Sequence, residues 1–243
     1  MRFDFSGKKY IVTGASSGIG EVTARLLRAA GAEVIAIGQN AAKLAALARD
    51  TGCQPLQLDI ADSAAMAAAI APLANIDGLV NCSGIALLDP CLALDAERFD
   101  RVMAINARGA AMMARHVAQG MLRDGRAGSI VNVSSQASLV ALDEHLAYCA
   151  SKAALDAITR SLCLELGPSG IRVNSVNPTV TLTPMAERAW SDPAKSGPML
   201  AAIPLRRFAT PEDVARPILF LLSDAAAMIS GVSLPIDGGY TCR

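Results

Sequence analysis

Aromatic residues and histidine are scarce in this sequence, and neither sign of charge is in excess. Only 4% of the 243 residues are aromatic, two are histidine, and 22 basic side chains balance 22 acidic ones. A chain without net charge or a basic cluster lacks the surface that nucleic acids and anionic membranes attract. No apolar run is long enough to span a bilayer, and residues 1–14 lack the apolar stretch of a signal peptide. We therefore expect a cytoplasmic protein without a nucleic-acid or membrane partner.

Cysteine pairs and clustered metal ligands are also missing. None of the six cysteines belongs to a C-x-x-C pair, and His116 and His145 are the only histidines. Disulfide frameworks and zinc sites need closer spacing or more ligands, so we interpret the cysteines as free thiols and expect no metal. Hydrophobic residues, by contrast, make up 52% of the chain. This composition favours one large domain over residues 1–243 with a substantial buried core.

Short apolar segments alternate with helical patterns along the whole chain. This alternation is typical of a Rossmann-like α/β domain, in which a doubly wound parallel sheet is flanked by helices. Helices are predicted over 99–120, over 147–166 and after the capping signal Asp62-Ser63. About seven strands are predicted, over 10–12, 33–37, 54–58, 78–80, 129–133, 172–176 and 233–235.

A glycine-rich turn follows the first strand. The segment KYIVTGASSGIG, residues 9–20, reads as strand, glycine turn and helix start. Glycines let the backbone approach a pyrophosphate, and the helix N-terminus presents free N–H groups to it. The spacing is GxxxGxG instead of GxGxxG, and an ordinary strand-to-helix turn is the alternative. We expect contacts with a dinucleotide from Gly14, Ser16, Ser17, Gly18, Ile19 and Gly20.

The ends of the next strands supply further candidates for the dinucleotide site. Gly38-Gln39 carries neither the acid that favours NAD nor the base that favours NADP, so Gln39 is compatible with either, with a slight lean to NAD. Asp59, followed by Ile60, either accepts a hydrogen bond from the adenine amine or serves as a turn or helix-cap aspartate. Asn81, Ser83 and Gly84 follow the fourth strand and are expected at the same edge of the sheet.

A tyrosine and a lysine lie at helical spacing in the segment Y-C-A-S-K. Tyr148 and Lys152 are four residues apart, so a helix places them on one face. A lysine ammonium beside a phenol is expected to stabilise the phenolate and lower its pKa. Ser135 lies thirteen residues upstream, with Ser134 as its rival. A bare YxxxK is a weak signal, but these groups together are able to move a proton on and off an alcohol or carbonyl.

Taken in order, the motifs resemble the classical short-chain dehydrogenase/reductase family. They are Thr13-Gly14-x3-Gly18-x-Gly20, Asn81-x-x-Gly84, Asn106, Ser135, Tyr148-x3-Lys152 and Asn177-Pro178, and they cover nearly the whole chain. The resemblance implies a nicotinamide cofactor, NAD or NADP, and a homotetramer with interfaces at the long helices and at residues 237–243. Cys82-Ser83 and Thr179 depart from the commonest family pattern. The uncharged Gly38-Gln39 prevents the cofactor preference from being copied.

The resemblance also implies roles for individual residues. Tyr148 is the expected acid/base, Lys152 lowers its pKa and binds the nicotinamide ribose, and Ser135 holds the substrate oxygen. Asn106 supports a water that leads protons from Lys152 to solvent, unless it is a simple surface residue. Pro178, Val180, Thr181 and Thr183 are expected to contact the cofactor.

A long, proline-punctuated segment over 181–203 is interpreted as a substrate loop or lid. Trp190 within it either walls the pocket or anchors the lid. Gln136, next to Ser135, and His145, before Tyr148, are expected to bind substrate hydroxyls, although His145 also fits a rim position.

Segments such as IVNVSSQAS (130–138) and NPTVTLTPM (177–185) resemble the L-xylulose reductase branch of the family. This implies an NAD(P)-dependent oxidoreductase for a small ketose or polyol, or an α-dicarbonyl compound. A 3-oxoacyl-[acyl-carrier-protein] reductase is the alternative, and its acidic carrier would need a basic rim, for which Arg188, Arg206 and Arg207 are candidates. A non-catalytic cofactor sensor or scaffold is the third possibility, and it would predict a broken catalytic set.

Overall fold

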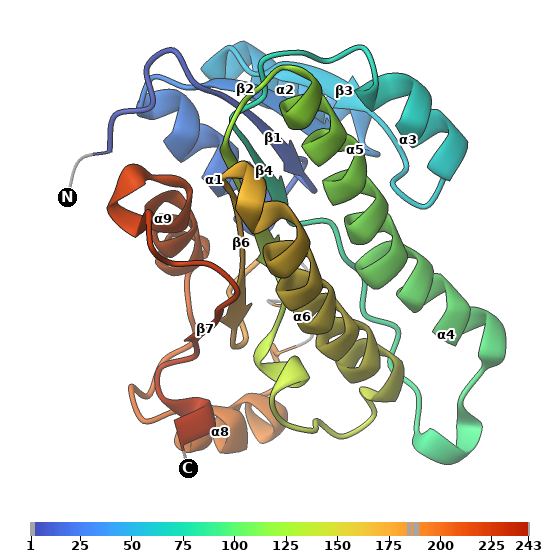
Figure 1. Ribbon diagram of the computed structural model, residues 1–243. Coiled ribbons are helices and arrows are strands. Elements are labelled where there is room, and N and C mark those ends of the chain that lie inside the picture. The colour runs from blue at the N-terminus through green and yellow to red at the C-terminus, as the bar shows by residue number, and fades with distance from the viewer. Residues whose placement is uncertain (1–2, 184–185, 187–189, 243) are drawn as a thin grey trace.

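Apolar strands and intervening helices build a single parallel sheet in the computed structural model, which describes residues 3–183, 186 and 190–242 (Figure 1). In this part of the chain the sheet has seven strands in the order β3-β2-β1-β4-β5-β6-β7, and each neighbouring pair is parallel. The strands are β1 (Lys9–Thr13), β2 (Glu33–Gly38), β3 (Gln54–Gln57), β4 (Gly78–Asn81), β5 (Gly128–Val133), β6 (Ile171–Pro178) and β7 (Ser233–Ile236). The predicted doubly wound α/β fold is confirmed.

Helices cover both faces of this sheet because its central strands are apolar on both sides. Alternate residues of β1 point to opposite faces, so Tyr10 and Val12 join one buried cluster with α1 and α9, and Ile11 joins another with α3 and α5. The helices are α1 (Gly18–Ala29), α2 (Ala41–Thr51), α3 (Ser63–Ile70), α4 (Ala96–Met103), α5 (Ala110–Arg123), α6 (Leu146–Leu166), α8 (Pro193–Ala202) and α9 (Pro211–Leu222). Within the described residues, no helix is both long and apolar enough to cross a membrane.

The strand order reverses between β1 and β4. From β1 the chain first builds outward through β2 and β3, and then returns to place β4 on the other side of β1. A crevice is expected at the carboxyl ends of strands at such a reversal. The glycine turn after β1 and the segment after β4 both lie at this edge.

Two predicted segments differ from the structure. The helix expected over 99–120 is interrupted by a π-helical turn, Ala104–Gly109, between α4 and α5. The segment 181–203, expected as a loop, contains α8, which begins after the capping Asp192 with a proline in its first turn. The same segment includes 184–185 and 187–189, which lie outside the described residues, as does the candidate rim residue Arg188.

Candidate active site

The glycine turn after β1 leaves no room for side chains. Gly14 and Gly18 have φ of 67° and 59°, which favours glycine. A Cβ on Gly20 would lie 2.5 Å from the carbonyl oxygen of Gly14, and one on Gly14 would lie 2.9 Å from the backbone nitrogen of Ser83. The turn therefore presents bare backbone at the start of α1. A pyrophosphate fits such a cradle.

The segment after β6 lies against this turn. The backbone nitrogen of Ala209 donates to the carbonyl oxygen of Val180 at 3.0 Å, which ties the segment to the chain before α9. Thr183 then reaches the glycine turn, because a Cβ on Gly18 would lie 2.9 Å from its methyl carbon. The Thr181 hydroxyl donates to the carbonyl oxygen of Thr179 at 2.9 Å. Thr183 is thus placed beside the predicted pyrophosphate site, whereas the hydroxyl of Thr181 already has a partner.

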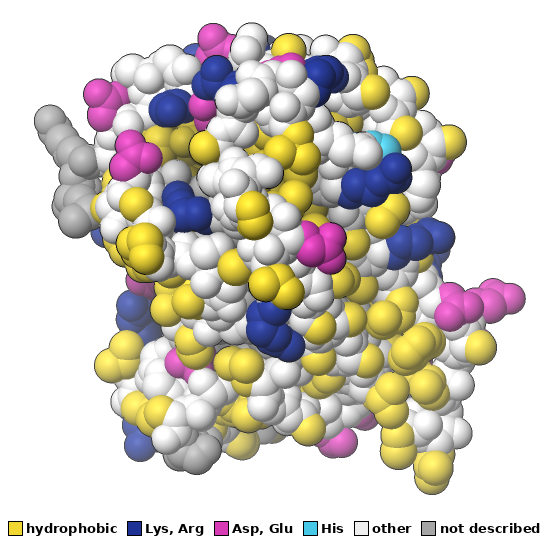
Figure 2. All heavy atoms as spheres, viewed as in Figure 1, with side chains coloured by type: hydrophobic (Ala, Val, Ile, Leu, Met, Phe, Trp, Pro, Cys, Tyr) yellow, Lys and Arg dark blue, Asp and Glu magenta, His cyan; other side chains and the backbone are white. Residues whose placement is uncertain are grey.

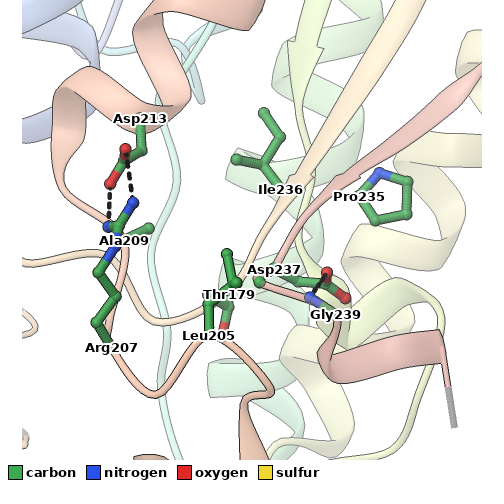
Figure 3. A pocket seen from close by; sticks show the side chains of 10 residues that line it. Thr179, Leu205, Arg207, Ala209, Asp213, Pro235, Ile236, Asp237 and Gly239 are labelled. Carbon is green, nitrogen blue, oxygen red and sulfur yellow. Dashed lines mark hydrogen bonds and ion pairs between the residues drawn. The ribbon is translucent and has the colours of Figure 1, made fainter.

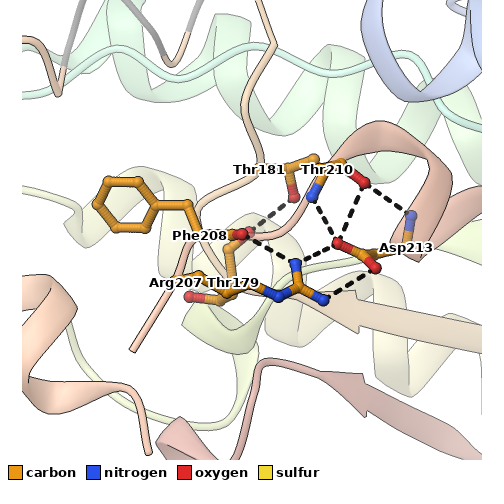
Figure 4. A network of polar contacts seen from close by, with 6 residues as sticks. All are labelled: Thr179, Thr181, Arg207, Phe208, Thr210 and Asp213. Atoms are coloured by element: carbon orange, nitrogen blue, oxygen red, sulfur yellow. Dashed lines mark hydrogen bonds and ion pairs between the residues drawn. The ribbon is translucent and has the colours of Figure 1, made fainter. Parts of the chain in front are cut away.

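An ion pair and a helix cap hold the chain that supports this segment (Figure 4). Thr210 caps α9, and the backbone nitrogen of Thr210 donates to the carboxylate of Asp213 at 2.8 Å. Asp213 also accepts from both terminal nitrogens of Arg207, at 2.5 and 3.1 Å. The guanidinium of Arg207 holds the pKa of Asp213 well below its usual range. The charge of Arg207 is therefore paired within the chain.

A cavity of about 510 Å³ opens beside this ion pair, at the carboxyl ends of β6 and β7 (Figure 3). Thr179, Arg207 and Asp237 are among its lining residues. Asp237 accepts hydrogen bonds from the backbone nitrogens of Gly239, at 2.9 Å, and Thr241, at 2.8 Å. The charged groups of this cavity are thus occupied by partners from the same chain. Sequence reasoning did not foresee the cavity.

The end of the site that is predicted to bind adenosine, called the adenosine end below, is exposed and makes few hydrogen bonds. The side chain of Gln39 is exposed, and the backbone carbonyl oxygen of Gln39 accepts from the side-chain amide of Gln57 at 3.0 Å. Asp59 accepts from the backbone nitrogen of Ala61 at 2.9 Å, which is the arrangement of a turn aspartate. Ile60 is 5% exposed and belongs to the core between the sheet and α3. Neither sign of charge follows β2.

The end of β4 is fixed to its neighbours by polar contacts. The Thr13 hydroxyl accepts from the backbone nitrogens of Cys82 and Ser83, at 3.0 and 3.1 Å, and so joins the ends of β1 and β4. The side chain of Asn81 is buried and donates to Asn132 at 2.9 Å and to the backbone of α5. The amide of Asn81, predicted to face the cofactor, is therefore used inside the fold.

Asn106 occupies the π-helical turn and is completely buried, which excludes the surface role. Its side-chain oxygen accepts from the backbone nitrogen of Ile85 at 2.9 Å, and its amide donates to the carbonyl oxygen of Ile85 at 2.8 Å. The same amide donates to Ser151 on α6 at 3.0 Å. A Cβ on Gly84 would lie 3.3 Å from the Asn106 oxygen and 3.4 Å from Nζ of Lys152. Gly84, Asn106 and Lys152 therefore lie together at the π-helical turn, and such turns are often found at functional sites.

The Ser135 hydroxyl lies beside the phenol of Tyr148 and acts to lower the pKa of that phenol. Tyr148 lies in the first turn of α6, and Ser135 follows β5. The rival Ser134 instead donates its hydroxyl to the backbone carbonyl of Lys152 at 3.2 Å. The structure thus distinguishes the two serines, because only Ser135 presents its hydroxyl to the phenol.

Lys152 lies beside the ring of Tyr148, but the expected lowering of the phenol pKa is wrong for the folded chain. Its Nζ is 5.7 Å from the ring centroid and donates to the carbonyl oxygen of Val133 at 2.8 Å. Burial raises the pKa of Tyr148, and the neighbouring Ser135 hydroxyl only partly opposes this. Burial also lowers the pKa of Lys152 to about 8. Desolvation by burial is the largest cause of both pKa shifts.

The three predicted substrate residues have different surroundings. Gln136 is 2% exposed, and its side-chain oxygen is buried without a hydrogen-bond partner among the described residues. His145 directly precedes α6, and its ring meets that of Tyr148 edge-on, with centroids 6.1 Å apart. Trp190 packs on Phe208 at 5.9 Å, which anchors the segment that follows β6. Gln136 and His145 therefore flank the serine and the tyrosine.

Sequence reasoning missed one buried acid next to the site. Asp156 lies one turn beyond Lys152 on α6 and is 4% exposed. The signal was present, because an aspartate at this spacing must share the face of Tyr148 and Lys152.

The chain matches the family model adh_short_C2, described as enoyl-(acyl carrier protein) reductase, over residues 14–241. It is 45% identical to L-xylulose reductase of Mus musculus over 241 residues, 99% of each chain. It is 46% identical to D-erythrulose reductase of Gallus gallus over 237 residues, 97% of this chain and 96% of that one. A solved structure from Agrobacterium tumefaciens with bound NADP has a TM-score of 0.92 at 32% identity, covering 100% of this chain and 99% of that chain.

These findings define the chain as an oxidoreductase with a Rossmann-like fold. It belongs to the short-chain dehydrogenase/reductase family.

Proposed function

We propose that this enzyme interconverts a small ketose and its polyol, or reduces an α-dicarbonyl compound, with NAD(P) as cofactor. One observation carries the proposal: the fold brings the phenol of Tyr148 together with the hydroxyl of Ser135 and the ammonium of Lys152, whose Nζ lies 5.7 Å from the phenol ring centroid. This places a proton donor next to a hydroxyl able to hold a carbonyl oxygen. The similarity to reductases named for xylulose and erythrulose supports a hydroxylated substrate.

The residues present fit a dinucleotide cofactor. Gly14, Gly18 and Gly20 have no room for a side chain, so the turn offers bare backbone N–H groups to a pyrophosphate at the start of α1. Thr183 covers the turn, and Lys152 and Gly84 lie at the other end of the proposed site. When bound, the nicotinamide supplies or accepts the hydride. Gly38 and Gln39 leave both NAD and NADP acceptable.

The chain's own residues manage the proton and the substrate oxygen. In reduction, Ser135 donates a hydrogen bond to the carbonyl oxygen, and Tyr148 donates its proton to that oxygen as the alcohol forms. In oxidation, Tyr148 takes the proton back. The raised pKa of Tyr148 keeps the phenol protonated near neutral pH, which favours its role as an acid. Lys152 and Asn106 lie between the phenol and the π-helical turn. Along this route, a proton returns to the phenol through water.

Substrate selection is assigned to the groups flanking Ser135 and Tyr148. The unpartnered oxygen of Gln136 is an acceptor without a donor, which a substrate hydroxyl provides after a small side-chain rearrangement. His145 stands beside the Tyr148 ring. The segment 181–203, with Trp190 as its aromatic anchor, is proposed to cover the substrate.

Self-association into a homotetramer in the cytoplasm is part of this proposal. The segment before α4 projects from the body, and apolar side chains gather there and over the neighbouring helices (Figures 1 and 2). Leu88, Leu92 and Leu94 are exposed in it, and Leu164 is exposed on α6. Such surface is typical of subunit contacts. Light scattering of the purified protein tests this, and a monomer at micromolar concentration would contradict it.

A cofactor-paired activity screen tests the reaction. The protein would be assayed with NADH and NADPH against xylulose, erythrulose, diacetyl and a β-ketoacyl thioester, and with the oxidised cofactors against pentitols and tetritols. Turnover of the sugars supports the proposal. Activity confined to the thioester would replace it with the acyl-carrier reductase. That alternative has little structural support, because Arg207 is paired with Asp213 and Arg206 donates to the backbone of Ala201.

A non-catalytic sensor or scaffold would bind the cofactor without turnover. The residues Asn106, Ser135, Tyr148 and Lys152 are all present and adjacent, which disfavours it. Full turnover by Tyr148→Phe would revive it.

A further inference from the structure

Three hydrogen-bond donors converge on the buried carboxylate of Asp156. The Ser175 hydroxyl donates to one oxygen at 2.8 Å. The Ser138 hydroxyl and the side-chain amide of Asn177 reach the other oxygen, at 2.5 and 2.8 Å. The donors come from β6 and from the turn that follows Ser135, whereas Asp156 belongs to α6. One carboxylate therefore joins three elements that meet beneath the proposed active site.

This cluster also holds the backbone of Ser135. The Ser138 hydroxyl lies 2.7 Å from the carbonyl oxygen of Ser135, and the amide of Asn177 lies 3.2 Å from the same oxygen. A hydroxyl has one proton, so Ser138 either donates to the carboxylate or to the Ser135 carbonyl, and Asn177 serves both. Ser135 is thus connected to Asp156 through two side chains.

The position of Asp156 on α6 indicates what its connection to Ser135 does. Tyr148, Lys152 and Asp156 are spaced at four-residue intervals, so one helical face carries all three. The phenol meets Ser135 near the start of this face, and the carboxylate fixes the turn containing Ser135 two turns further along. The two attachments together set where the Ser135 hydroxyl lies relative to the phenol.

We propose that Asp156 is a positioning residue, which fixes the Ser135 hydroxyl against Tyr148 through Ser138 and Asn177. The inference rests on the proposed roles of Ser135 and Tyr148 in carbonyl reduction. Asp156 acts through its hydrogen-bond acceptors and not through its charge. A small displacement of a group that orients substrate costs about 100-fold in rate, which sets the size of the effect.

Two substitutions at this position separate hydrogen bonding from charge. Asp156→Asn keeps an acceptor for Ser138 and Asn177, and the Ser175 hydroxyl rotates to accept from the new amide. Asp156→Leu removes every acceptor in a similar volume. We expect kcat for ketose reduction to fall about 10- to 100-fold in Asp156→Leu and to stay within about 5-fold in Asp156→Asn, with cofactor affinity by fluorescence titration nearly unchanged. Equal losses in both variants would overturn the positioning role, because the charge would then be what matters.

A matched control removes buried polar contacts from the same strand away from the site. Asn174 on β6 is completely buried, donates to the carbonyl oxygen of Ile229 at 2.9 Å and accepts from the backbone nitrogen of Val232 at 3.2 Å. Asn174→Leu should destabilise the fold, as Asp156→Leu does, but leave kcat within about 2-fold. A loss of kcat in the control as large as that in Asp156→Leu would show a general packing effect and contradict the proposal.

Combining the substitutions of Asp156 with Ser135→Ala tests whether Asp156 acts through Ser135. If Asp156 acts through Ser135, Asp156→Leu lowers kcat no further once the Ser135 hydroxyl is gone. A second loss of about 10-fold or more would overturn the proposal. Failure of the proposed function is seen separately, as full activity in Ser135→Ala alone.

A milder variant covers the case in which Asp156→Leu does not fold. Ser138→Ala cuts one of the two links and leaves the carboxylate with Asn177 and Ser175. We expect a smaller loss of kcat, again absent in the Ser135→Ala background. Unchanged kcat in Ser138→Ala together with a further loss in the double variant would contradict the proposal.

Discussion

The two ends of the proposed cofactor site are built in opposite ways. At the catalytic end, Asn106, Lys152 and Asp156 are buried, and each is held by hydrogen bonds or a close neighbour from another element. At the adenosine end, Gln39 and Asp59 are exposed, and in their hydrogen bonds with Gln57 and Ala61 a backbone group is one of the partners. The catalytic end is a buried hydrogen-bond network, whereas the adenosine end is an exposed surface.

Because of this difference, substitutions at the catalytic end are costly, whereas substitutions at the adenosine end are tolerated. A buried polar network loses several partners when one member is altered. An exposed side chain on a strand end is replaced with little effect on the fold. We therefore expect the interior end to fix the reaction type and the exposed end to set the cofactor preference.

The largest effect is expected at the interior end, from Tyr148→Phe. This change removes the proton donor and keeps the ring that packs beside His145. We expect kcat for ketose reduction to fall about 10³- to 10⁴-fold with little change in cofactor affinity, because only proton transfer is lost. Steady-state kinetics with a fluorescence titration of the cofactor would measure both. A loss of less than about 10-fold would show that another group supplies the proton.

A substitution at the exposed adenosine end should alter the preference for NADH or NADPH and leave the reaction itself unchanged. Gln39→Asp places an acid where the ribose is expected, and Gln39→Arg places a base there. We expect the ratio of kcat/KM for NADH over NADPH to rise in the first and fall in the second, each by about 10- to 100-fold. The two variants serve as controls for each other. Shifts in the same direction would mean that residue 39 does not face the ribose.

The buried lysine should make stability depend on pH. The pKa of Lys152 lies at about 8 in the folded chain against an ordinary 10.5, so folding disfavours its charged form. The unfolded chain then binds more protons between these values, and stability rises with pH in that window. Relative to Lys152→Met, the unfolding free energy should rise by roughly 1 kcal/mol from pH 8 to 9 in urea titrations. Burial raises the pKa of the Cys82 thiol to about 12 although Lys152 lowers it, so removal of Lys152 leaves this thiol protonated in the folded chain from pH 8 to 9. A falling difference would mean that the ammonium is stabilised by folding.

The smallest effect is expected outside both ends, at the cap of α9. Asp213→Asn weakens the ion pair with Arg207 and one half of the capping box with Thr210. Because the pair is partly exposed, we expect a loss of about 1 kcal/mol in stability and kcat within about 2-fold of the wild type. Thermal unfolding and steady-state kinetics measure these values. A large loss of kcat would show that the cap also positions the segment carrying Thr183.

Local signals were sufficient to predict the sheet and most of the helices. The apolar runs and glycine punctuation identified each strand to within about two residues. The pattern is clearest for the central strands, which are buried on both faces, whereas the edge strands β3 and β7 are largely exposed or half-buried. The π-helical turn at Asn106 was not foreseeable, since the pairing of its amide with Ile85 is a tertiary contact. The helix α8 was missed because Gly197 and Pro198 read as loop residues.

In the candidate site, the motif residues were found where spacing alone places them. Tyr148 and Lys152 follow from the helical repeat. The choice of Ser135 over Ser134 agrees with the position of the Ser135 hydroxyl beside the phenol, whereas the Ser134 hydroxyl donates to the backbone of α6. The direction of the Tyr148 pKa was predicted wrongly, because desolvation depends on packing that a linear pattern does not reveal. Asp156 was missed for a related reason, since its partners lie on other elements.

The most direct test of the account follows a hydride into the product. The protein would be incubated with xylulose and a nicotinamide cofactor carrying deuterium at C4, with each face labelled in turn, and the polyol would be analysed by mass spectrometry. The account predicts one deuterium on the former carbonyl carbon from one of the two labels, and almost no labelled polyol with Tyr148→Phe in the same time. Polyol formed without deuterium from either label, or labelled equally fast by Tyr148→Phe, would contradict it.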